Sequence, residues 1–432
     1  MSARREWLCL VLGLVLAAAW AGPLFGAEPA ATPAAGTTVS IVKGADVEKM
    51  VAEALDLIGG LGPILKDGDT VVIKPNLVTP DKAERPGLMT DVRVVGALVR
   101  QIQKVARCRI IIAEGSASDW NQDRRTRLAF EQNGYADLAK QCGAELKDLN
   151  EDQRITVRPA GLGYPEYEMP ETIMKCNVLI DVPVPKTHLL TGVTLGMKNL
   201  FGLMPLPKAQ FHEKIHEVLC DIVRMRKPDL TVVDALVCTE GQGPLWGTPV
   251  RMDLILAGRD VVAVDAVMTA VMGYEPRRIR HLALAAKSGL GEIDLNRIAV
   301  RGRPIAEVKR PFACATWDAQ IVLPKTDALA KKVLALADGV EPIEHRHGVV
   351  GKEARFKAER LRSDTAKYPL RKSYGFTVGI YDERDGLVFR APYETLFEEN
   401  CQAAIEEMYR WIEENLGVKQ KGAAGPKGVY EN

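Results

Sequence analysis

Short apolar runs alternate with amphipathic helical patterns through the middle of the chain, and this alternation restricts the possible fold more than any other feature. The runs Thr70–Lys74, Arg109–Ala113 and Asn177–Val182 are rich in Val and Ile, as expected for strands buried on both faces. Helical patterns at Asp91–Val105 and Ala209–Arg226 lie between strands of this kind. Strands separated by helices predict an α/β fold with a doubly wound, mostly parallel sheet, whose ligands bind beyond the carboxyl ends of the strands.

Flanking segments extend this pattern on both sides. We predict three more strands and two more helices: strands at Val39–Val42, Leu230–Val233 and Met252–Leu256, and helices at Ala45–Ile58 and Asp260–Met272. A chain of 432 residues is long enough for two lobes and a further small unit. We therefore assign residues 39–308 to a two-lobed α/β domain.

The pattern changes after residue 308. We predict a helix at Glu353–Lys367, a hairpin turn at Asp385-Gly386 between the strands Thr377–Tyr381 and Leu387–Phe389, and a last helix at Tyr393–Leu416. These elements predict a small C-terminal α+β appendage over residues 309–416, followed by a flexible tail at 417–432.

The first residues are typical of an export signal. Arg4 and Arg5 precede the uncharged apolar run Leu8–Trp20, which is short for a membrane span, and Ala19-Trp20-Ala21 offers a cleavage site. We expect residues 1–21 to be the signal and 22–38 a flexible leader, so that no membrane span is left after cleavage. The paired arginines resemble a twin-arginine signal. The ordinary export route and an uncleaved anchor are the alternatives, and each gives a periplasmic or otherwise exported protein.

Charge and cysteine usage exclude several classes of partner and cofactor. The chain has 57 Lys and Arg against 56 Asp and Glu, so no general field attracts nucleic acid or an anionic membrane. A partner must therefore be recognised at a local site. The sequence contains no C-x-x-C pair, and we expect no iron–sulfur cluster ligated by cysteines of this chain.

Polar side chains follow four of the predicted strands. Lys74 and Asn76 end one strand, Glu114 ends the next, and Asp181 and Asp234 end two more. Because the carboxyl ends of parallel strands meet at one edge of a sheet, these side chains predict a ligand pocket. Taken singly, a solvated lysine or a carboxylate that caps backbone amides is an equal alternative.

The segment that follows Asp181 carries the highest density of reactive side chains. Its lysines can bind anions or form covalent adducts, and its imidazoles can ligate a metal. The residues concerned are Lys186, His188, Lys198, Asn199, His212 and His216, with Gly192 and Gly196 allowing unusual backbone geometry before Lys198.

A second pattern overlaps this segment. His212-Glu213-Lys214-Ile215-His216 fits H-E-x-x-H, the helical zinc-peptidase pattern in which two imidazoles share one helix face. The charged residues Lys214 and Glu217 are unlike those of such helices, and an exposed structural histidine pair is the alternative.

Several of these motifs together resemble domain-of-unknown-function family 362. The matching segments are Val72–Leu77, Asp181, Pro185–His188, Met197–Gly202 and Asp260–Asp265, within residues 39–308. Some members of that family carry an added ferredoxin-like cluster domain, whose cysteines this chain lacks. The resemblance implies an architecture and leaves the reaction open.

The chain also resembles, more distantly, the nickel-pincer lactate racemase family. As in that family, His188 and Lys198 are ten positions apart across a glycine-rich loop, and His212 or His216 follows. The resemblance implies that Lys198 anchors or contacts a pyridinium-derived cofactor and that a later histidine ligates nickel. The family's arginine loop and second histidine are absent at Asn76–Pro80 and Glu114–Ala117, which argues against lactate racemisation itself and leaves Glu114 as an alternative base.

Together, these patterns lead to one main hypothesis. We expect an exported enzyme that acts on a small anionic molecule and depends on a cofactor or a metal, for which the racemase resemblance implies nickel. A non-catalytic anion-binding or cofactor-binding protein is the alternative, and a zinc metallopeptidase is a third. The predicted catalytic residues are Lys198, His188 and Glu114, the cofactor-binding residues are Lys74, Asn76, Asp181, Lys186, Asn199 and Asp234, and the metal ligands are His212 and His216.

Overall fold

The computed structural model describes residues 37–79, 86–117, 125–345, 348–356, 375–381, 386–394 and 398–418. The predicted export signal, nearly all of the leader and the tail after residue 418 lie outside these residues. In the part of the chain that is described, no helix combines the length and the apolar character that crossing a bilayer requires.

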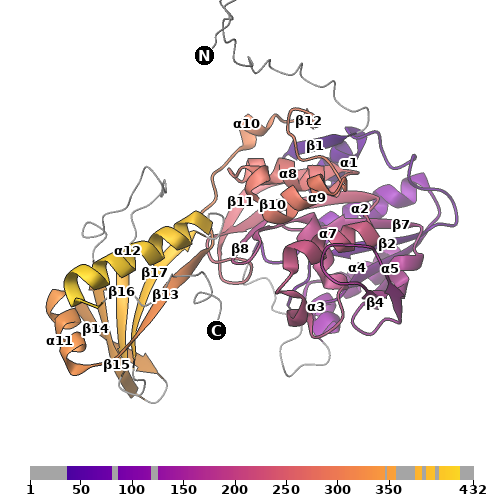
Figure 1. Cartoon of the computed structure of the whole chain (residues 1–432). Helices are drawn as coiled ribbons and strands as arrows, with labels where there is room; N and C mark the ends of the chain where they lie inside the picture. Colours follow the sequence, from indigo (N-terminus) through magenta and orange to yellow (C-terminus); the bar gives the residue numbers. More distant parts are fainter. Residues whose placement is uncertain are drawn as a thin grey trace, which may run out of the picture.

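A central sheet organises the described residues up to 308 (Figure 1). Its strands pair in the order β12-β1-β11-β10-β7-β2-β3-β4, and all neighbours are parallel except the β1–β11 and β11–β10 pairs. The short strands β8 (Lys186–His188) and β9 (Gly192–Thr194) extend the sheet beside the end of β10. The bounds of the main strands are β1 Thr38–Lys43, β2 Thr70–Pro75, β3 Arg109–Glu114, β4 Glu145–Asp148, β7 Val178–Val182, β10 Leu230–Glu240, β11 Thr248–Gly258 and β12 Ala299–Gly302.

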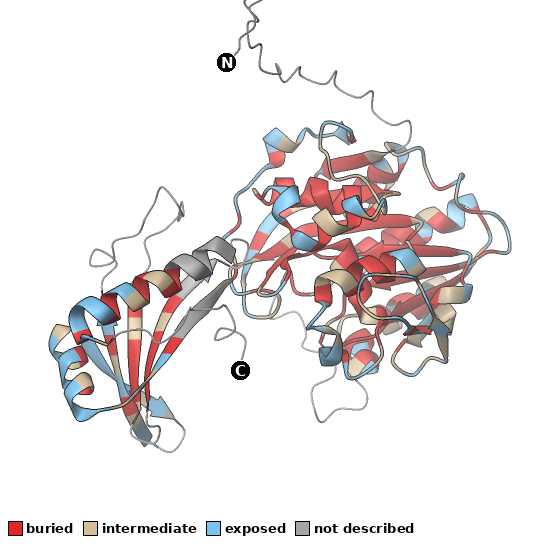
Figure 2. Cartoon of the chain, viewed as in Figure 1, coloured by how far each residue is buried: buried red, intermediate tan, exposed pale blue. Residues whose placement is uncertain are grey.

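Helices cover both faces of this sheet, which confirms the predicted α/β class with a mostly parallel sheet. Successive strand residues serve opposite cores, so Val72 packs in one core while Val71 and Ile73 pack in the other. This is why the central strands are apolar throughout, and Figure 2 shows them buried. One face carries α1 Val47–Asp56, α2 Val92–Val105, α3 Arg125–Gln132 and α4 Tyr135–Cys142; the other carries α5 Glu171–Lys175, α6 Gly196–Asn199, α7 Ile215–Met225, α8 Val261–Val271 and α9 Arg280–Lys287.

A two-stranded sheet lies outside this arrangement, formed by β5 (Arg154–Val157) and β6 (Tyr167–Pro170), which pair antiparallel. The short helix α10 (Ile305–Val308) ends the main domain's regular elements.

The C-terminal domain is an antiparallel sheet with two helices, which matches the predicted α+β appendage. The aromatic rings of Phe356, Phe376, Phe389 and Trp411 pack together in its core. Its strands pair in the order β13-β17-β16-β15-β14, with bounds β13 Thr316–Pro324, β14 Gly339–His345, β15 Gly348–Phe356, β16 Phe376–Tyr381 and β17 Gly386–Glu394, and its helices are α11 Asp327–Leu336 and α12 Glu398–Leu416.

Two helix predictions in this domain need correction. Residues 353–356 of the predicted helix Glu353–Lys367 belong to strand β15, where alternate residues Ala354 and Phe356 face the core; the rest lies outside the described residues. The last helix starts at Glu398 instead of Tyr393, because β17 continues to Glu394 in its pairing with β13.

The linker between the domains packs on the main domain. The backbone N–H groups of Arg310 and Phe312 donate to Val271 O and Met272 O, both at 2.9 Å. Phe312 is buried in the core of the main domain, and the Arg310 guanidinium contacts both carboxylate oxygens of Glu240 at 3.0 Å. The second domain therefore begins near Thr316, later than the predicted boundary at residue 309.

Candidate functional site

The carboxyl ends of the central strands bring the predicted polar residues together around one cavity of about 250 Å³. In the β2–β7 pairing, Lys74 lies opposite Asp181, and β3 places Glu114 beside them. Most of the predicted site residues line the cavity: Lys74, Asn76, Glu114, Lys186, His188, Lys198, Asn199 and His212. Asp181, Asp234 and His216 are outside its lining.

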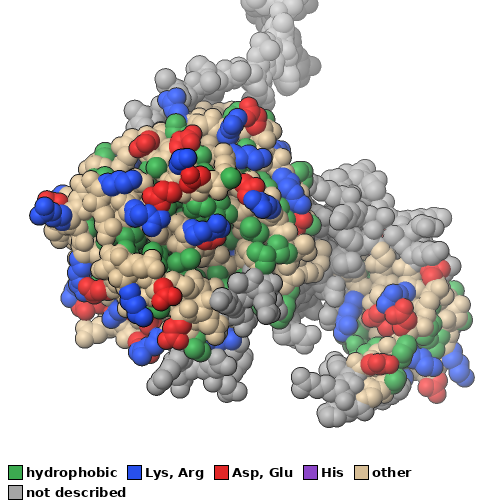
Figure 3. Space-filling model, turned by 180° about the vertical axis from the view of Figure 1, so that it is seen from behind, with side chains coloured by type: hydrophobic (Ala, Val, Ile, Leu, Met, Phe, Trp, Pro, Cys, Tyr) green, Lys and Arg blue, Asp and Glu red, His purple; other side chains and the backbone are tan. Residues whose placement is uncertain are grey.

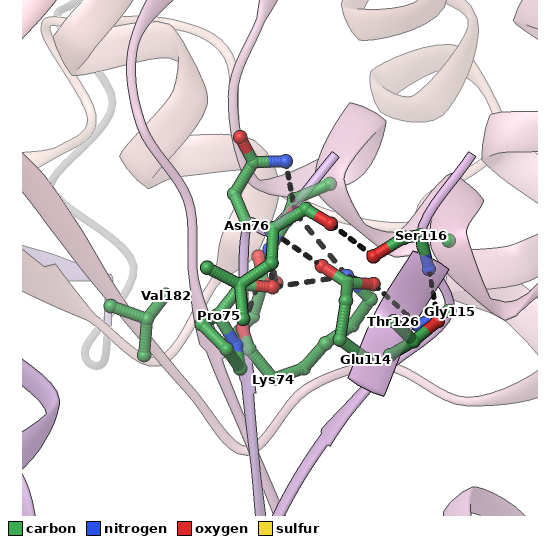
Figure 4. Close-up of polar contacts among 12 residues, drawn as sticks. Lys74, Pro75, Asn76, Glu114, Gly115, Ser116, Thr126 and Val182 are labelled. Atoms are coloured by element: carbon green, nitrogen blue, oxygen red, sulfur yellow. Dashed lines mark hydrogen bonds and ion pairs between the residues drawn. The ribbon is translucent and has the colours of Figure 1, made fainter. Parts of the chain in front are cut away.

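Two residues of the cavity lining, Lys74 and Glu114, form an ion pair (Figure 4). Lys74 Nζ is 2.8 Å from Glu114 Oε1, and both side chains are almost fully buried. Glu114 also accepts hydrogen bonds from the backbone N–H groups of Leu77 at 2.8 Å and Gly115 at 2.7 Å. This carboxylate ties the end of β3 to the loop after β2. These three donors hold the carboxylate in place, and the role of Glu114 as a base stays a prediction.

Two amide side chains connect this pair to the neighbouring strands. Asn199 Oδ1 accepts from Lys74 Nζ at 3.3 Å and from Asn76 Nδ2 at 2.9 Å, while Asn199 Nδ2 donates to Asp181 Oδ1 at 2.7 Å. Asn76 Oδ1 in turn accepts from Lys186 Nζ. Burial raises the pKa of Asp181 well above its usual range. Asp181 is outside the cavity lining and supports the site through its hydrogen bond with Asn199.

A carboxylate from α8 holds the loop that carries Lys198. Asp265 accepts hydrogen bonds from the backbone N–H groups of Gly196 at 2.8 Å and Met197 at 2.9 Å, at the start of α6. A Cβ at Gly196 would lie 2.9 Å from Asp265 Oδ1 and 3.0 Å from Asp181 Oδ2, so only glycine allows this approach. The glycine-rich sequence therefore positions Lys198 by letting α6 dock on two buried carboxyl groups.

Three further lysines line the cavity, and the surroundings of each lower its pKa. Burial, reinforced by the charge of Lys198, lowers the pKa of Lys186 to about 7. Burial, reinforced by Lys74, lowers the pKa of Lys198 to about 8. Burial also lowers the pKa of Lys208 to about 7. The sequence interpretation missed Lys208. The one sequence feature that could have indicated a site role for Lys208 is its position shortly after Lys198.

The hydrogen bonds of His188 define its protonation state. Its Nδ1 accepts from the backbone N–H groups of Leu190 at 2.9 Å and Thr191 at 3.4 Å, so the ring proton is on Nε2. Burial, with the nearby Lys198 charge, lowers the pKa of His188 well below its usual range. The neutral imidazole can therefore donate a hydrogen bond to a ligand but cannot readily accept a proton.

The H-E-x-x-H pattern is not on one helix. The predicted helix Ala209–Arg226 begins only at Ile215. His212 directly follows a separate 3-10 helix, Lys208–Phe211. His212 lies against the Phe201 ring, with the ring centroids 5.3 Å apart, and faces the cavity. His216 stacks on His281, with centroids 6.0 Å apart. The two imidazoles therefore do not form the arrangement of a zinc peptidase.

The predicted metal ligands also lack partners to complete a site. No group of three or more His, Cys, Asp or Glu side chains is placed to hold a metal ion within the described ranges. The donor set contributed by His212 and His216 does not fit a metal centre, because one faces the cavity and the other is packed between α7 and α9.

Asp234 needs a further correction, since it lies away from the lysines. Its carboxylate accepts from the backbone N–H groups of Asp91 at 2.7 Å and Leu236 at 3.2 Å. It borders a separate hollow with Asp91 and Arg93. Asp234 thus holds the start of α2 instead of contacting a cofactor in the lysine-lined cavity.

The fold and the site define a class of protein: an α/β domain with a lysine-rich pocket at the carboxyl end of a mostly parallel sheet. Residues 71–270 match the family described as Domain of unknown function (DUF362), which confirms the predicted family over this part of the chain.

Two known proteins are similar to the chain. The thylakoid-associated protein sll1697 of Synechocystis sp. is 29% identical over 246 residues, which cover 55% of this chain and 73% of that protein. A solved structure, the lactate racemase apoprotein from Thermoanaerobacterium thermosaccharolyticum, is 16% identical with a TM-score of 0.34, and the match covers 54% of this chain and 57% of that one.

Proposed function

We propose that the cavity binds a small molecule with more than one negative charge, and that the domain is an enzyme acting on this molecule. The observation that carries the proposal is a charge imbalance. Lys186, Lys198 and Lys208 line one cavity, and among the described residues none of them forms an ion pair with a carboxylate. The carboxylate in the lining, Glu114, is already paired with Lys74.

The imbalance has an energetic consequence that favours an anionic ligand. Burying an ammonium group without a counter-charge is unfavourable, which is why these lysines have lowered pKa values. A bound anion would replace the missing counter-charge and stabilise the protonated lysines. On the face in Figure 3, by contrast, the described basic and acidic side chains are interspersed.

The chemical character of the lining favours catalysis over simple storage. Lys198 has a pKa near the physiological range, and His188 presents a neutral N–H donor to the same cavity. Perturbed groups of this kind gather at catalytic sites. We also propose that Lys198 contacts a cofactor, as the sequence predicts. Because the described histidines do not form a metal site, we derive no step through a metal.

A screen for thermal stabilisation tests the proposal. The purified protein is heated with phosphate, sulfate, phosphate esters and mono-, di- and tricarboxylates, each beside a neutral analogue. We expect a multiply charged anion to stabilise the protein, by about 2.7 kcal/mol at a concentration of 100 Kd. Lys186→Met and Lys198→Met should remove the effect, whereas Lys287→Met, an exposed position on α9, should preserve it.

The outcomes of this screen separate the hypotheses. No stabilisation by any anion, or equal stabilisation of Lys198→Met and the unmodified protein, would contradict the proposal. A ligand that co-purifies with the protein and is recovered unaltered after prolonged incubation would favour the non-catalytic binding protein.

We also propose that the protein is exported, on the support of Arg4, Arg5 and the apolar run after them. Cell fractionation tests this location. Replacing both arginines by lysine should retain the precursor in the cytoplasm if the twin-arginine route is used, and leave export unchanged if the ordinary route is used.

A further inference from the structure

The four cavity lysines differ in what their amino groups contact. Lys74 pairs with Glu114, Lys186 donates to Asn76, and Lys208 donates to Gly202 O at 2.9 Å, Met204 O at 2.7 Å and Asn150 Oδ1 at 3.0 Å. Lys198 Nζ lies 4.5 Å from the centroid of the Phe201 ring and has no hydrogen bond or ion pair with any described residue. Its amine is therefore the one that no described acceptor holds in place.

The surroundings of Lys198 favour a neutral amine. The charged groups near it are the ammonium groups of Lys74 and Lys186, and the imidazoles of His188, His212 and His281 add no counter-charge. The nearby Asp265 carboxyl is occupied by two backbone N–H groups of α6. A lysine in an apolar, cation-rich pocket is an activated nucleophile.

The same cavity presents a donor that can activate a carbonyl group. Because both Nδ1 contacts of His188 come from backbone N–H groups, the ring is fixed as the tautomer that carries its proton on Nε2. A neutral imidazole N–H polarises a carbonyl oxygen without giving up its proton. Lys186, on the same lining, supplies a cation for a carboxylate or phosphate of the ligand, because the bound anion stabilises the protonated form of this lysine.

We propose that Lys198 forms an imine with an anionic aldehyde or ketone: doubly charged 2-oxo acids such as 2-oxoglutarate are the expected ligands, and singly charged ones are smaller probes of the same chemistry. This inference rests on the proposed function and names the chemical class of the ligand. The amine lone pair attacks the carbonyl carbon, the π electrons move to oxygen, and one proton passes from nitrogen to oxygen through solvent to give a carbinolamine. The hydroxyl group then takes a second proton from solvent, the nitrogen lone pair forms the C=N bond as the C–O bond breaks and water leaves, and the nitrogen returns a proton to solvent. One amine and one carbonyl thus give one imine and one water, without an oxidant or reductant.

Borohydride trapping tests the inference on the full chain. The protein is incubated separately with glyoxylate, pyruvate and 2-oxoglutarate at pH 8, reduced with sodium borohydride, digested and mapped by mass spectrometry. We expect a stable secondary amine at Lys198 and little at the exposed Lys287. The rate of modification at Lys198 should be half-maximal near pH 8, whereas an ordinary exposed lysine titrates near 10.4.

Two variants control for folding and for charge. Lys198→Arg keeps a cation, so it should lose the adduct while anions still stabilise the protein. Lys198→Met should lose both the adduct and the stabilisation by anions. No adduct at Lys198 with any of the three probes, or equal labelling of Lys198 and Lys287, would overturn the imine. If anions still stabilise the protein in that case, the proposed function survives. If no anion stabilises it, the proposed function fails as well.

Discussion

The two domains treat charge differently. In the main domain Lys74, Lys186, Asp181 and Asp265 are at most 1% exposed, and they converge on one end of the sheet. In the described part of the C-terminal domain, Glu407 on α12 is the one buried charged side chain, and it pairs with Arg410. The core of that domain is apolar, with aromatic rings in direct contact.

This difference bears on where the proposed site lies, because buried charged groups lower the stability of a domain. An apolar core gains free energy from every buried side chain, whereas a buried charge loses hydration and regains it only from suitable partners. Proteins keep such groups where a site needs them. The buried charges therefore support the proposal that the main domain has the binding chemistry.

Breaking the buried Lys74–Glu114 ion pair should cause the largest loss of stability in the main domain. Glu114→Gln leaves the Lys74 ammonium buried without its counter-charge, so we expect the main domain to lose about 3–5 kcal/mol of stability. Hydrogen–deuterium exchange, read separately on peptides from each domain, measures the loss. The matched control is Glu145→Gln, which breaks the exposed pair with Arg109 and should change stability by less than about 1 kcal/mol. Equal effects of the two substitutions would show that burial does not distinguish them.

A methyl group added beside the same ion pair should have the next largest effect. At Gly202 a Cβ would lie 2.6 Å from Glu114 Oε1 and 2.9 Å from Lys74 Nζ, so Gly202→Ala should cost about 1–3 kcal/mol and weaken anion binding. In the C-terminal domain, Gly339→Ala adds its Cβ where no atom lies within 4 Å and should preserve both properties. Urea denaturation and the anion screen provide the two measurements. A tolerated Gly202→Ala would mean that the ion pair can move aside.

The pH dependence of stability sharpens the comparison further. The pKa of Lys186 is about 7 in the folded protein and about 10.4 in an unfolded chain, so between these values the unfolded chain binds the extra proton. The contribution of Lys186 to stability is complete above the pKa of the unfolded chain. It is lost as the pH falls through the pKa of the folded protein. Lys186→Met should reduce the rise in stability between pH 7 and 10 by up to about 1.4 kcal/mol per pH unit. Lys352→Met, at an exposed position of β15, should leave the slope of stability against pH unchanged. An unchanged slope in Lys186→Met would contradict the lowered pKa of Lys186.

The smallest expected effect concerns a helix cap in the C-terminal domain. Thr326 accepts a hydrogen bond from Leu329 N at 3.2 Å at the start of α11, so Thr326→Ala should cost about 1 kcal/mol, and Thr326→Ser should recover most of it. Exchange in the peptides of α11 measures this cost. Anion binding should not change, and a change would indicate that the two domains are coupled more closely than their separate cores suggest.

The sequence was sufficient to predict the helices and strands whose apolar residues follow a regular pattern. The apolar runs at Thr70–Lys74 and Arg109–Ala113 predicted strands buried on both faces, and the strand-end rule placed Lys74, Asn76 and Glu114 at one edge. Periodicity failed at Glu353, where a charged strand of an exposed sheet surface resembles a helix in sequence. Short exposed strands carry little apolar signal.

The errors in the site have a different cause. A sequence pattern reports spacing, but the role of a side chain depends on the direction in which it points. His212 and His216 would share a helix face only if the helix had started three residues earlier, and the preceding 3-10 turn prevents this. Asp234 is at a strand end as predicted, yet its strand continues to Glu240 and its carboxylate turns toward α2. Lys208 was missed because its position behind Lys198 in the sequence is a weak signal, and the fold brings it to the same cavity lining as Lys186 and Lys198.

The docked linker has a practical consequence for dividing the protein. Truncation at residue 309 would remove Phe312 from the main core and would release Glu240, whose carboxylate holds both Arg310 and the backbone N–H of Ala313. The loop directly after Glu240 supplies Pro244 and Leu245 to the cavity wall. A separately expressed main domain should therefore extend to residue 315, so that the linker remains as part of the scaffold behind the pocket.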